Sequence, residues 1–150
     1  MPYPLDLPQI SLFHHRIPLQ IRFNDIDLLG HVNNTIYFSF YDTGKARYME
    51  AVRKGEINFR KVESVIANID CAFRRPIYFG QNIDCLTRLL EIGDKHIKLQ
   101  QMIVDHDTNE VHSLCETVMV YVDVASLHPI RVPDDWRRLY KEFEGLPENM

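Results

Sequence analysis

Alternation between apolar and polar residues predicts five β-strands in this chain. The first covers residues 16–24. Its apolar face consists of Ile17, Leu19, Ile21 and Phe23. Because Pro18 has no backbone N–H to donate, we expect this strand to begin at a sheet edge. The other predicted strands cover residues 62–73, 82–92, 95–105 and 111–124.

Short turn sequences separate the last three predicted strands, at Gly93-Asp94 and at Asp107-Thr108-Asn109. Strands joined by such turns pair antiparallel. One face of the segment 62–73 carries Val65, Ala67, Ile69, Cys71 and Phe73. In the segment 111–124 we expect Met119 and Tyr121 on one face and, on the other, Leu114, Val118, Val120, Val122 and Val124.

A long helix is predicted between the first two strands, from about Thr35 to Arg53. One apolar stripe at helical spacing consists of Ile36, Phe40, Ala46 or Arg47, and Ala51. The adjacent stripe consists of Tyr37, Tyr41, Tyr48 and Val52. Glycine costs about 1 kcal/mol relative to alanine inside a helix, so Gly44 indicates close packing against a neighbouring backbone.

Both ends of the chain depart from the strand pattern. Residues 1–13 are rich in proline and predict an extended arm. Residues 133–144 predict a short amphipathic helix, because a proline followed by two aspartates suits a helix start. Its apolar face consists of Trp136, Leu139, Tyr140 and Phe143.

The element order, one strand, a long helix and then four strands, predicts a single α+β domain over residues 1–150. An antiparallel sheet must curve around the helix to bury it. One helix covers only one face of the sheet, and the other face also carries apolar residues. We therefore expect a second subunit.

Composition and charge exclude several classes of protein. The formal net charge is −4, without the basic surplus that is typical of nucleic-acid binding. No apolar run approaches the roughly 18 residues of a membrane-spanning helix, and the first residues lack a signal-peptide pattern. The three cysteines, Cys71, Cys85 and Cys115, form no CxxC pair and are expected to be reduced, buried thiols. These features predict a cytoplasmic protein.

The segment from Arg22 to Tyr37 concentrates groups that can carry chemistry. It places Asp25, Asp27, His31 and two asparagines directly before the predicted long helix. The start of a helix has unpaired N–H groups and a partial positive charge, which can stabilise an oxyanion. A carboxylate a few residues upstream can act as a nucleophile or a general base. Together these groups suit acyl transfer to water.

A metal site fits this segment poorly. If its first aspartate began a calcium loop, Leu29 would be at position five and Ile36 at position twelve, where an acidic ligand is needed. A transition metal would require a second histidine at ligand spacing. We expect no metal and no cofactor. Purely structural roles stay open, in which Asp27 or Asn33 caps the helix and His31 is a hydrogen-bonded loop residue.

The segment resembles the signature of the 4-hydroxybenzoyl-CoA thioesterase-like branch of the hotdog-fold superfamily, D-x-D-x-x-G-H-V-N-N-x-x-Y. The matching residues are Asp25, Asp27, Gly30, His31, Val32, Asn33, Asn34 and Tyr37. The run Phe73-Arg74-Arg75-Pro76-Ile77-Tyr78-Phe79-Gly80 is similar to the aromatic-x-R-P-x-x-x-G turn of the same family. The resemblance covers about residues 16–132.

This resemblance implies a hotdog fold, in which a curved antiparallel sheet wraps a long central helix. It also implies a homodimer or homotetramer with active sites at the subunit interface, and an acyl-CoA or acyl-carrier-protein thioester as the substrate. Asp27 matches the catalytic carboxylate, and Asn34 matches the position whose backbone N–H polarises the thioester carbonyl. His31 is a third catalytic candidate. The expected substrate contacts in the signature are Gly30, Asn33 and Tyr37.

Coenzyme A carries several phosphates, so its binding requires basic groups near the site. Arg74 and Arg75 are candidates, and an equal alternative is that both are solvated surface residues. Two other functions are open to a hotdog domain. A dehydratase or hydratase would use His31 with Asp27, although the motif context favours a thioesterase. A non-catalytic acyl-CoA-binding module is the other, and the presence of Asp27 argues against it.

Overall fold

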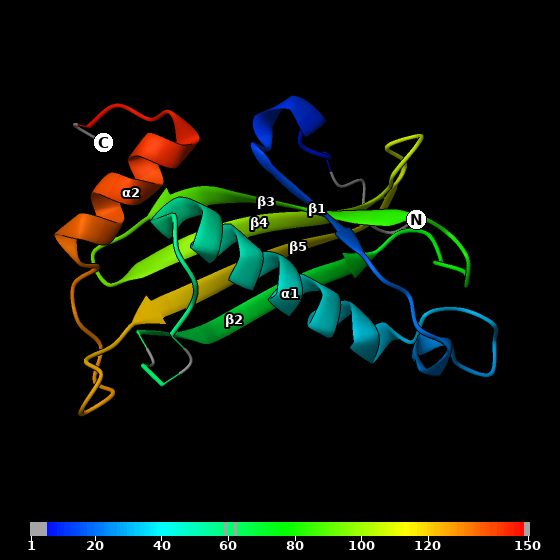
Figure 1. Ribbon diagram of the computed structural model, residues 1–150, viewed down its shortest axis with the longest axis horizontal. Coiled ribbons are helices and arrows are strands. Elements are labelled where there is room, and N and C mark those ends of the chain that lie inside the picture. The colour runs from blue at the N-terminus through cyan, green and yellow to red at the C-terminus, as the bar shows by residue number, and fades with distance from the viewer. Residues whose placement is uncertain (1–5, 59, 62, 149–150) are drawn as a thin grey trace.

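The computed structural model describes residues 6–58, 60, 61 and 63–148, which form a curved antiparallel sheet around one long helix (Figure 1). The strands are β1 (His15–Leu19), β2 (Ser64–Phe73), β3 (Ile83–Ile92), β4 (His96–Asp105) and β5 (Val111–Tyr121). Their order in the sheet is β1-β3-β4-β5-β2, and all neighbouring pairs are antiparallel. The helix α1 (Asn34–Arg53) crosses one face of the sheet, and α2 (Asp134–Glu144) lies near its C-terminal end. The predicted element order is confirmed.

The helix α1 turns its tyrosine stripe toward the sheet. Its buried residues are Tyr37, Phe40, Tyr41, Gly44, Lys45, Tyr48 and Val52. A methyl group at Gly44 would overlap the Sγ atom of Cys85 and lie 2.8 Å from Nε2 of Gln101. The close packing indicated by Gly44 is therefore present, but it is against side chains of β3 and β4 and not against backbone.

The helix α2 closes the end of the sheet where α1 finishes. Its predicted apolar face is confirmed, since Trp136 and Tyr140 are buried together with Tyr48 and Tyr121. The hydroxyl oxygens of Tyr121 and Tyr140 are 2.6 Å apart, so these two polar groups satisfy each other inside an apolar cluster. This second cluster lengthens the core beyond the part that lies under the first turns of α1.

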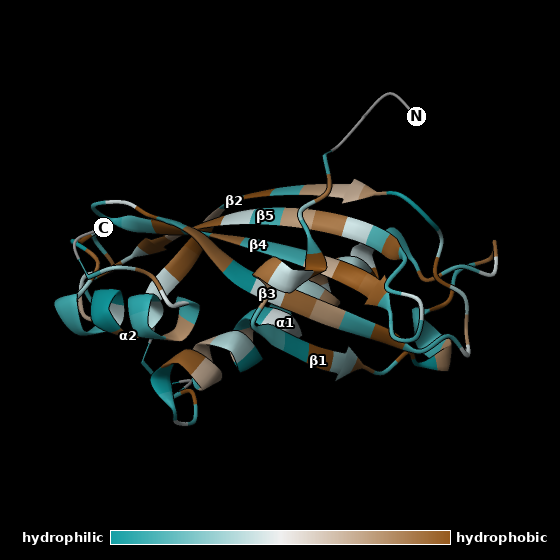
Figure 2. Cartoon of the chain, turned by 90° about the horizontal axis from the view of Figure 1, so that it is seen from above, coloured by the Kyte–Doolittle hydropathy of each residue, from teal (hydrophilic) through white to brown (hydrophobic). Residues whose placement is uncertain are grey.

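The N-terminal segment covers part of the sheet face that lies away from α1, and Figure 2 shows this segment and α1 on opposite sides of the sheet. Its apolar residues pack on a cluster formed by Leu86, Met102, Val104 and Leu114. The prediction of an extended arm is only partly correct, because Ile10–Leu12 form a 3-10 helix, η1. Residues 1–5 of the predicted arm lie outside the described residues. Some of the apolar surface that suggested a second subunit is thus covered by the chain itself.

Two predicted strands extend past the observed C-terminal ends, whereas the C-terminal ends of the other three agree with the structure. The first ends at Leu19, and Phe23 is 81% exposed at the start of a second 3-10 helix, η2 (Phe23–Asp25). The last ends at Tyr121, because the chain then turns through a hydrogen bond from the N–H of Leu127 to the carbonyl of Asp123. The hydrophobic alternation continues past both strand ends, whereas the regular ladder ends there and is followed after Tyr121 by an isolated bridge between Val122 and Pro129.

The predicted faces of β2 and β5 are partly correct. Ile69 and Cys71 pack against the α1 side of the sheet. A bulge between Ile66 and Asn68 shifts the alternation of β2, and Val65 is consequently exposed instead of sharing their environment. In β5, Met119 and Tyr121 pack with α2, while Leu114 lies under the N-terminal segment, as the predicted division of faces requires.

Candidate active site

Asp25 holds together the loop that precedes α1. Its buried carboxylate accepts hydrogen bonds from the backbone N–H of Arg22 at 2.8 Å and from the guanidinium of the same residue at 3.2 Å. Its backbone carbonyl accepts the N–H of Asn33 at 2.8 Å. Ile26 and Val32 add an antiparallel bridge across the loop. Asp25 therefore has a structural role, which distinguishes it from the second aspartate of the motif.

Asp27 lies at the tip of this closed loop and stays partly exposed. Its Oδ1 atom accepts hydrogen bonds from the backbone N–H groups of Leu29 at 2.9 Å and His31 at 3.3 Å. Among the described residues, no group donates to Oδ2. Gly30 allows the tight turn, because its φ of 82° is strained for any residue with a Cβ atom. The loop thus orients one carboxylate oxygen and leaves the other available.

Asn33 caps the long helix, which answers one of the alternatives left open by the sequence. Its side-chain oxygen accepts hydrogen bonds from the backbone N–H of Thr35 at 2.9 Å and from the Thr35 hydroxyl at 2.8 Å. Asn34 is the first residue of α1. Within the described part of the chain its backbone N–H has no acceptor, as expected for the first turn of a helix. This N–H is available to a ligand.

His31 packs against Tyr78 rather than against Asp27. The two rings meet edge to face with their centroids 5.0 Å apart, and the two backbones form an isolated antiparallel bridge. The N–H of Val32 continues this pairing by donating to the carbonyl of Ile77 at 2.8 Å. In the ranges that the structure describes, no hydrogen bond joins the imidazole to the carboxylate of Asp27, so no His–Asp pair for proton transfer is assembled.

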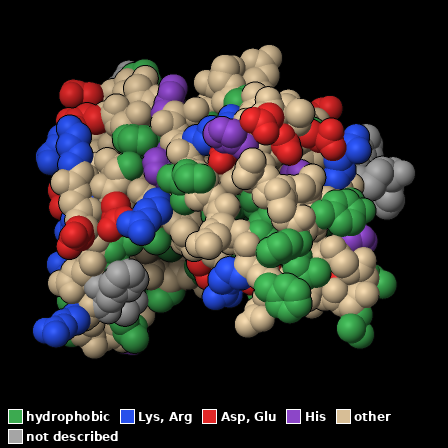
Figure 3. Space-filling model, turned by 45° about the vertical axis from the view of Figure 1, so that its right-hand side comes forward, with side chains coloured by type: hydrophobic (Ala, Val, Ile, Leu, Met, Phe, Trp, Pro, Cys, Tyr) green, Lys and Arg blue, Asp and Glu red, His purple; other side chains and the backbone are tan. Residues whose placement is uncertain are grey.

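An open pocket of about 710 Å³ lies over this loop. It is lined by Phe23, Ile26, Asp27, Leu28, Leu29, Asn33 and Phe79. Figure 3 shows hydrophobic side chains gathered on the surface at this end of the molecule. Of the residues that line the pocket, Leu28 is fully exposed, and the ring of Phe23 meets that of Phe79 edge to face with 6.4 Å between ring centroids. The pocket therefore combines one carboxylate with an apolar rim that can accept an uncharged chain.

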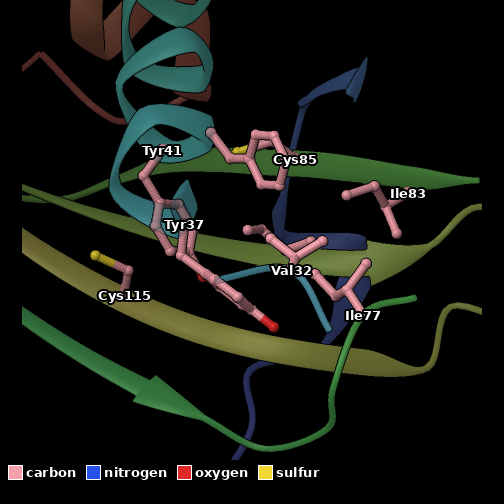
Figure 4. Close-up of a cluster of buried hydrophobic side chains, with 9 residues drawn as sticks. Val32, Tyr37, Tyr41, Ile77, Ile83, Cys85 and Cys115 are labelled. Atoms are coloured by element: carbon pink, nitrogen blue, oxygen red, sulfur yellow. The ribbon is translucent and has the colours of Figure 1, made fainter. Parts of the chain in front are cut away.

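Tyr37, an expected substrate contact, lies in the core instead of in this pocket. Figure 4 shows it beneath the first turn of α1, beside Val32 and Ile77. Its ring meets Phe73 edge to face at a centroid distance of 4.9 Å. Burial raises the pKa of Tyr37 to about 12. Its packing anchors the start of the helix to the end of β2.

Comparison with known proteins identifies the family. The model of the thioesterase-like superfamily matches residues 21–139 of this chain. The chain belongs to the thioesterase-like superfamily. Membership agrees with the resemblance noted in the signature segment, and the matched range includes that segment and the strands β2 to β5.

Several known proteins resemble the chain over most of its length. The chloroplast acyl-acyl carrier protein thioesterase of Arabidopsis thaliana is 24% identical over 132 residues, which are 87% of this chain and 70% of that protein. A thioesterase from Thermus thermophilus, solved in complex with coenzyme A and Zn, has a TM-score of 0.79 and 23% identity, covering 92% of this chain and 100% of that one. A predicted thioesterase from Bacillus stearothermophilus has a TM-score of 0.78 and 21% identity, covering 88% of this chain and 97% of that one. The expected hotdog fold is confirmed.

Arg74 and Arg75 follow directly after β2, at the end of the sheet where α1 begins. Their backbone N–H groups donate to the carbonyl of His112 at 2.8 and 3.1 Å. The guanidinium of Arg75 is 3.0 Å from a carboxylate oxygen of Glu110, and both side chains of this pair are exposed. An exposed pair of this kind contributes little to stability. The side chain of Arg75 can therefore reorient toward an anionic ligand, and that of Arg74 is partly exposed beside it.

Sequence reasoning missed Lys45. This lysine lies on the buried side of α1, where only 5% of its surface is exposed. A signal was present, because Lys45 is four residues after Tyr41 and three before Tyr48, on the stripe that predicts the buried side. A charged residue within an apolar stripe indicates either a paired ion or a ligand contact.

Within residues 6–58, 60, 61 and 63–148, no three histidine, cysteine, aspartate or glutamate side chains come close enough to hold a metal ion. None of the helices that these residues form has both the length and the apolar character to cross a membrane. All three cysteines are free thiols, Cys85 and Cys115 buried and Cys71 partly so.

Proposed function

We propose that this chain hydrolyses an acyl thioester to a free acid and a free thiol, with Asp27 as the nucleophile or general base. The observation that supports this most is a shared pocket: the carboxylate of Asp27 and the helix cap Asn33 line it together. The available N–H of Asn34 follows the cap directly. A thioester bound there would have a helix N–H at its carbonyl oxygen and a carboxylate near its carbonyl carbon.

Coenzyme A is the preferred thiol carrier in this proposal, ahead of an acyl-carrier protein. Arg74 and Arg75 would supply the positive charge that its phosphates need, at the end of the sheet where α1 begins. His31 is assigned a positioning role, because its ring contacts Tyr78 and its backbone N–H contacts Asp27. Gly30 shapes the same loop, and Tyr37 supports it from below.

We also propose that the active unit is a homodimer formed through β2. The sheet order leaves one edge of β2 without a neighbouring strand among the described residues. Val65 and Ile66 are each more than two-fifths exposed there. An open strand edge with apolar side chains is a template for pairing with a second chain. Two copies paired antiparallel would continue the sheet and bring each loop of Asp27 to the interface.

The proposal is tested by thiol release from a panel of acyl-CoA and acyl-carrier-protein thioesters. Asp27→Asn keeps the shape of the side chain and removes its charge. Turnover should fall by about 10²–10⁴-fold, the usual contribution of a positioned acid or base. Asp107→Asn removes an exposed carboxylate from the turn before β5 and is the matched control, expected to retain full activity.

Two outcomes would contradict the assignment in different ways. Equal turnover in Asp27→Asn and the wild type would remove Asp27 from the chemistry. Saturable acyl-CoA binding without any turnover would favour the binding module. The dimer is tested separately by sedimentation of the wild type and of Val65→Glu, which should shift the population toward a monomer of low activity; an active wild-type monomer would overturn this part.

A further inference from the structure

A second pocket, distant from Asp27 in the same chain, contains the buried lysine of α1. It has a volume of about 520 Å³ and lies between the C-terminal half of α1, the start of β2 and Trp136 of α2. Its walls are largely apolar, with Met49, Val65 and Met119 among them. Such a pocket suits a hydrocarbon chain, apart from Lys45.

The ammonium of Lys45 is incompletely paired. Its Nζ atom is 3.4 Å from the side-chain oxygen of Gln101 and 3.5 Å from a carboxylate oxygen of Asp42. Both distances are long for a charged donor, which usually bonds at about 2.7–2.9 Å. The Asp42 side chain is 63% exposed, whereas that of Lys45 is 6% exposed. A lysine buried with such weak partners retains the capacity to bind an anion.

The charges around the pocket reinforce this capacity. Its charged lining residues are the cations Lys45, Arg53 and Lys61 and the carboxylates Asp42 and Glu63. The carboxylate of Glu63 pairs with two cations, because its oxygens lie 3.1 Å from a guanidinium nitrogen of Arg53 and 3.8 Å from Nζ of Lys61. Among the described lining residues one positive charge is therefore in surplus, although the whole chain carries a net charge of −4.

The pocket is too far from Asp27 of its own chain to share one short substrate with it. Lys45 is eleven residues after Asn34, which corresponds to about 16 Å along a helix. The proposed β2 pairing changes this. Pairing about the midpoint of β2 would place Phe73 of a second copy against Ser64, at the mouth of this pocket. Because Tyr37 contacts Phe73, the start of α1 of the second copy would lie there too.

We propose that this pocket receives the distal end of the acyl group, and that Lys45 selects acyl groups ending in a carboxylate. The substrates would then be monothioesters of dicarboxylic acids, with the hydrocarbon part against the apolar walls and the carboxylate on the ammonium. This inference rests on the proposed thioesterase function and on the β2 dimer, and it adds the class of acyl group.

The test compares kcat/KM for ω-carboxyacyl-CoA and simple acyl-CoA of equal chain length, from four to ten carbons, using the full-length protein. The wild type should prefer the ω-carboxyacyl series by at least tenfold at its best length. Lys45→Met should remove this preference and leave the simple acyl series within about twofold. Lys45→Arg keeps the charge and should keep the preference, and Lys95→Met, at an exposed position, should behave as the wild type.

The contradicting outcomes are separable. A wild type that prefers simple acyl groups at every length overturns the inference without any variant, while thioester hydrolysis stands. An equal rise of KM for every acyl-CoA in Lys45→Met would assign Lys45 to the coenzyme A phosphates instead. Absence of hydrolysis across both series would overturn the proposed function itself, and this inference with it.

Discussion

Cys71 and Cys115 lie directly opposite each other in the ladder between β2 and β5. A hydrogen bond from the Cys115 thiol lowers the pKa of Cys71 to about 7, and Ser113, whose hydroxyl is 3.6 Å from the Cys71 sulfur, acts in the same direction. Burial raises the pKa of the third thiol, Cys85, to about 12. The three cysteines therefore differ in the fraction of thiolate at neutral pH.

Thiol labelling should follow this difference, because the thiolate is the reactive form. We expect the alkylation rate of Cys71 to rise steeply between roughly pH 6 and pH 8 and then to level off. Cys85 should stay unlabelled over the same range in the folded protein. Mass spectrometry after short iodoacetamide pulses measures both rates, with Cys71→Ser as the control. Labelling of Cys85 before Cys71 would contradict the assignment.

Gly44→Ala should destabilise the fold by about 1–3 kcal/mol, because the added methyl group overlaps Cys85 in a packed core. Gly55→Ala is the matched control. No atom lies within 4 Å of a Cβ atom built at Gly55, so its effect should stay within about 0.5 kcal/mol. The free energy of unfolding in urea measures both changes. Similar values for the two variants would show that α1 can move away from the sheet at little cost.

His106 should make stability depend on pH through Asp84. The Asp84 carboxylate accepts a hydrogen bond from Nδ1 of His106 at 2.7 Å, which raises the pKa of the histidine above its usual 6.5. Since the folded pKa is the higher one, the stabilising contribution is complete below about pH 6.5 and is lost as the pH rises through the folded pKa. The free energy of unfolding of the wild type should thus exceed that of His106→Gln by less at roughly pH 8.5 than at roughly pH 5.5.

Urea denaturation at several pH values measures this loss, and His14→Gln is the control because His14 is exposed and outside the contact with Asp84. The difference between the wild type and His14→Gln should not change with pH. A His106→Gln difference that grows on going from acid to alkaline pH would have the opposite sign and would contradict the role of the contact with Asp84.

The N-terminal segment should contribute to stability through Phe13. This side chain packs on the outer sheet cluster, and the guanidinium of Arg88 lies 5.4 Å from its ring centroid. Phe13→Ser should lower the free energy of unfolding by about 1–3 kcal/mol, which is close to the range for burying such a side chain. It should also increase the binding of a hydrophobic dye. Leu12→Ser is the control, because Leu12 is 44% exposed in the same N-terminal segment. Equal behaviour of the two variants would contradict this packing.

The local sequence pattern was sufficient to predict the order of the elements and the position of the candidate site. Strand alternation, helical spacing and turn residues act over a few neighbours, so they are readable before folding. The segment before α1 was recognisable for the same reason, since a loop with two carboxylates ahead of a helix start is contiguous in the chain. The spacing alone did not separate Asp25 from Asp27, and the resemblance to the family pointed to Asp27. The buried contact of Asp25 with Arg22 adds a physical reason for that distinction.

What the sequence determined by itself is therefore the succession of elements, the family signature and, through that signature, Asp27 as the candidate carboxylate, because each depends on neighbouring residues. The tertiary structure alone decided which surfaces are covered. The N-terminal segment lies on the outer face of the sheet, a bulge redirects β2, and Lys45 is buried beside Gln101. These features arise from contacts between residues far apart in the chain, where packing and burial, and not local preference, set the conformation.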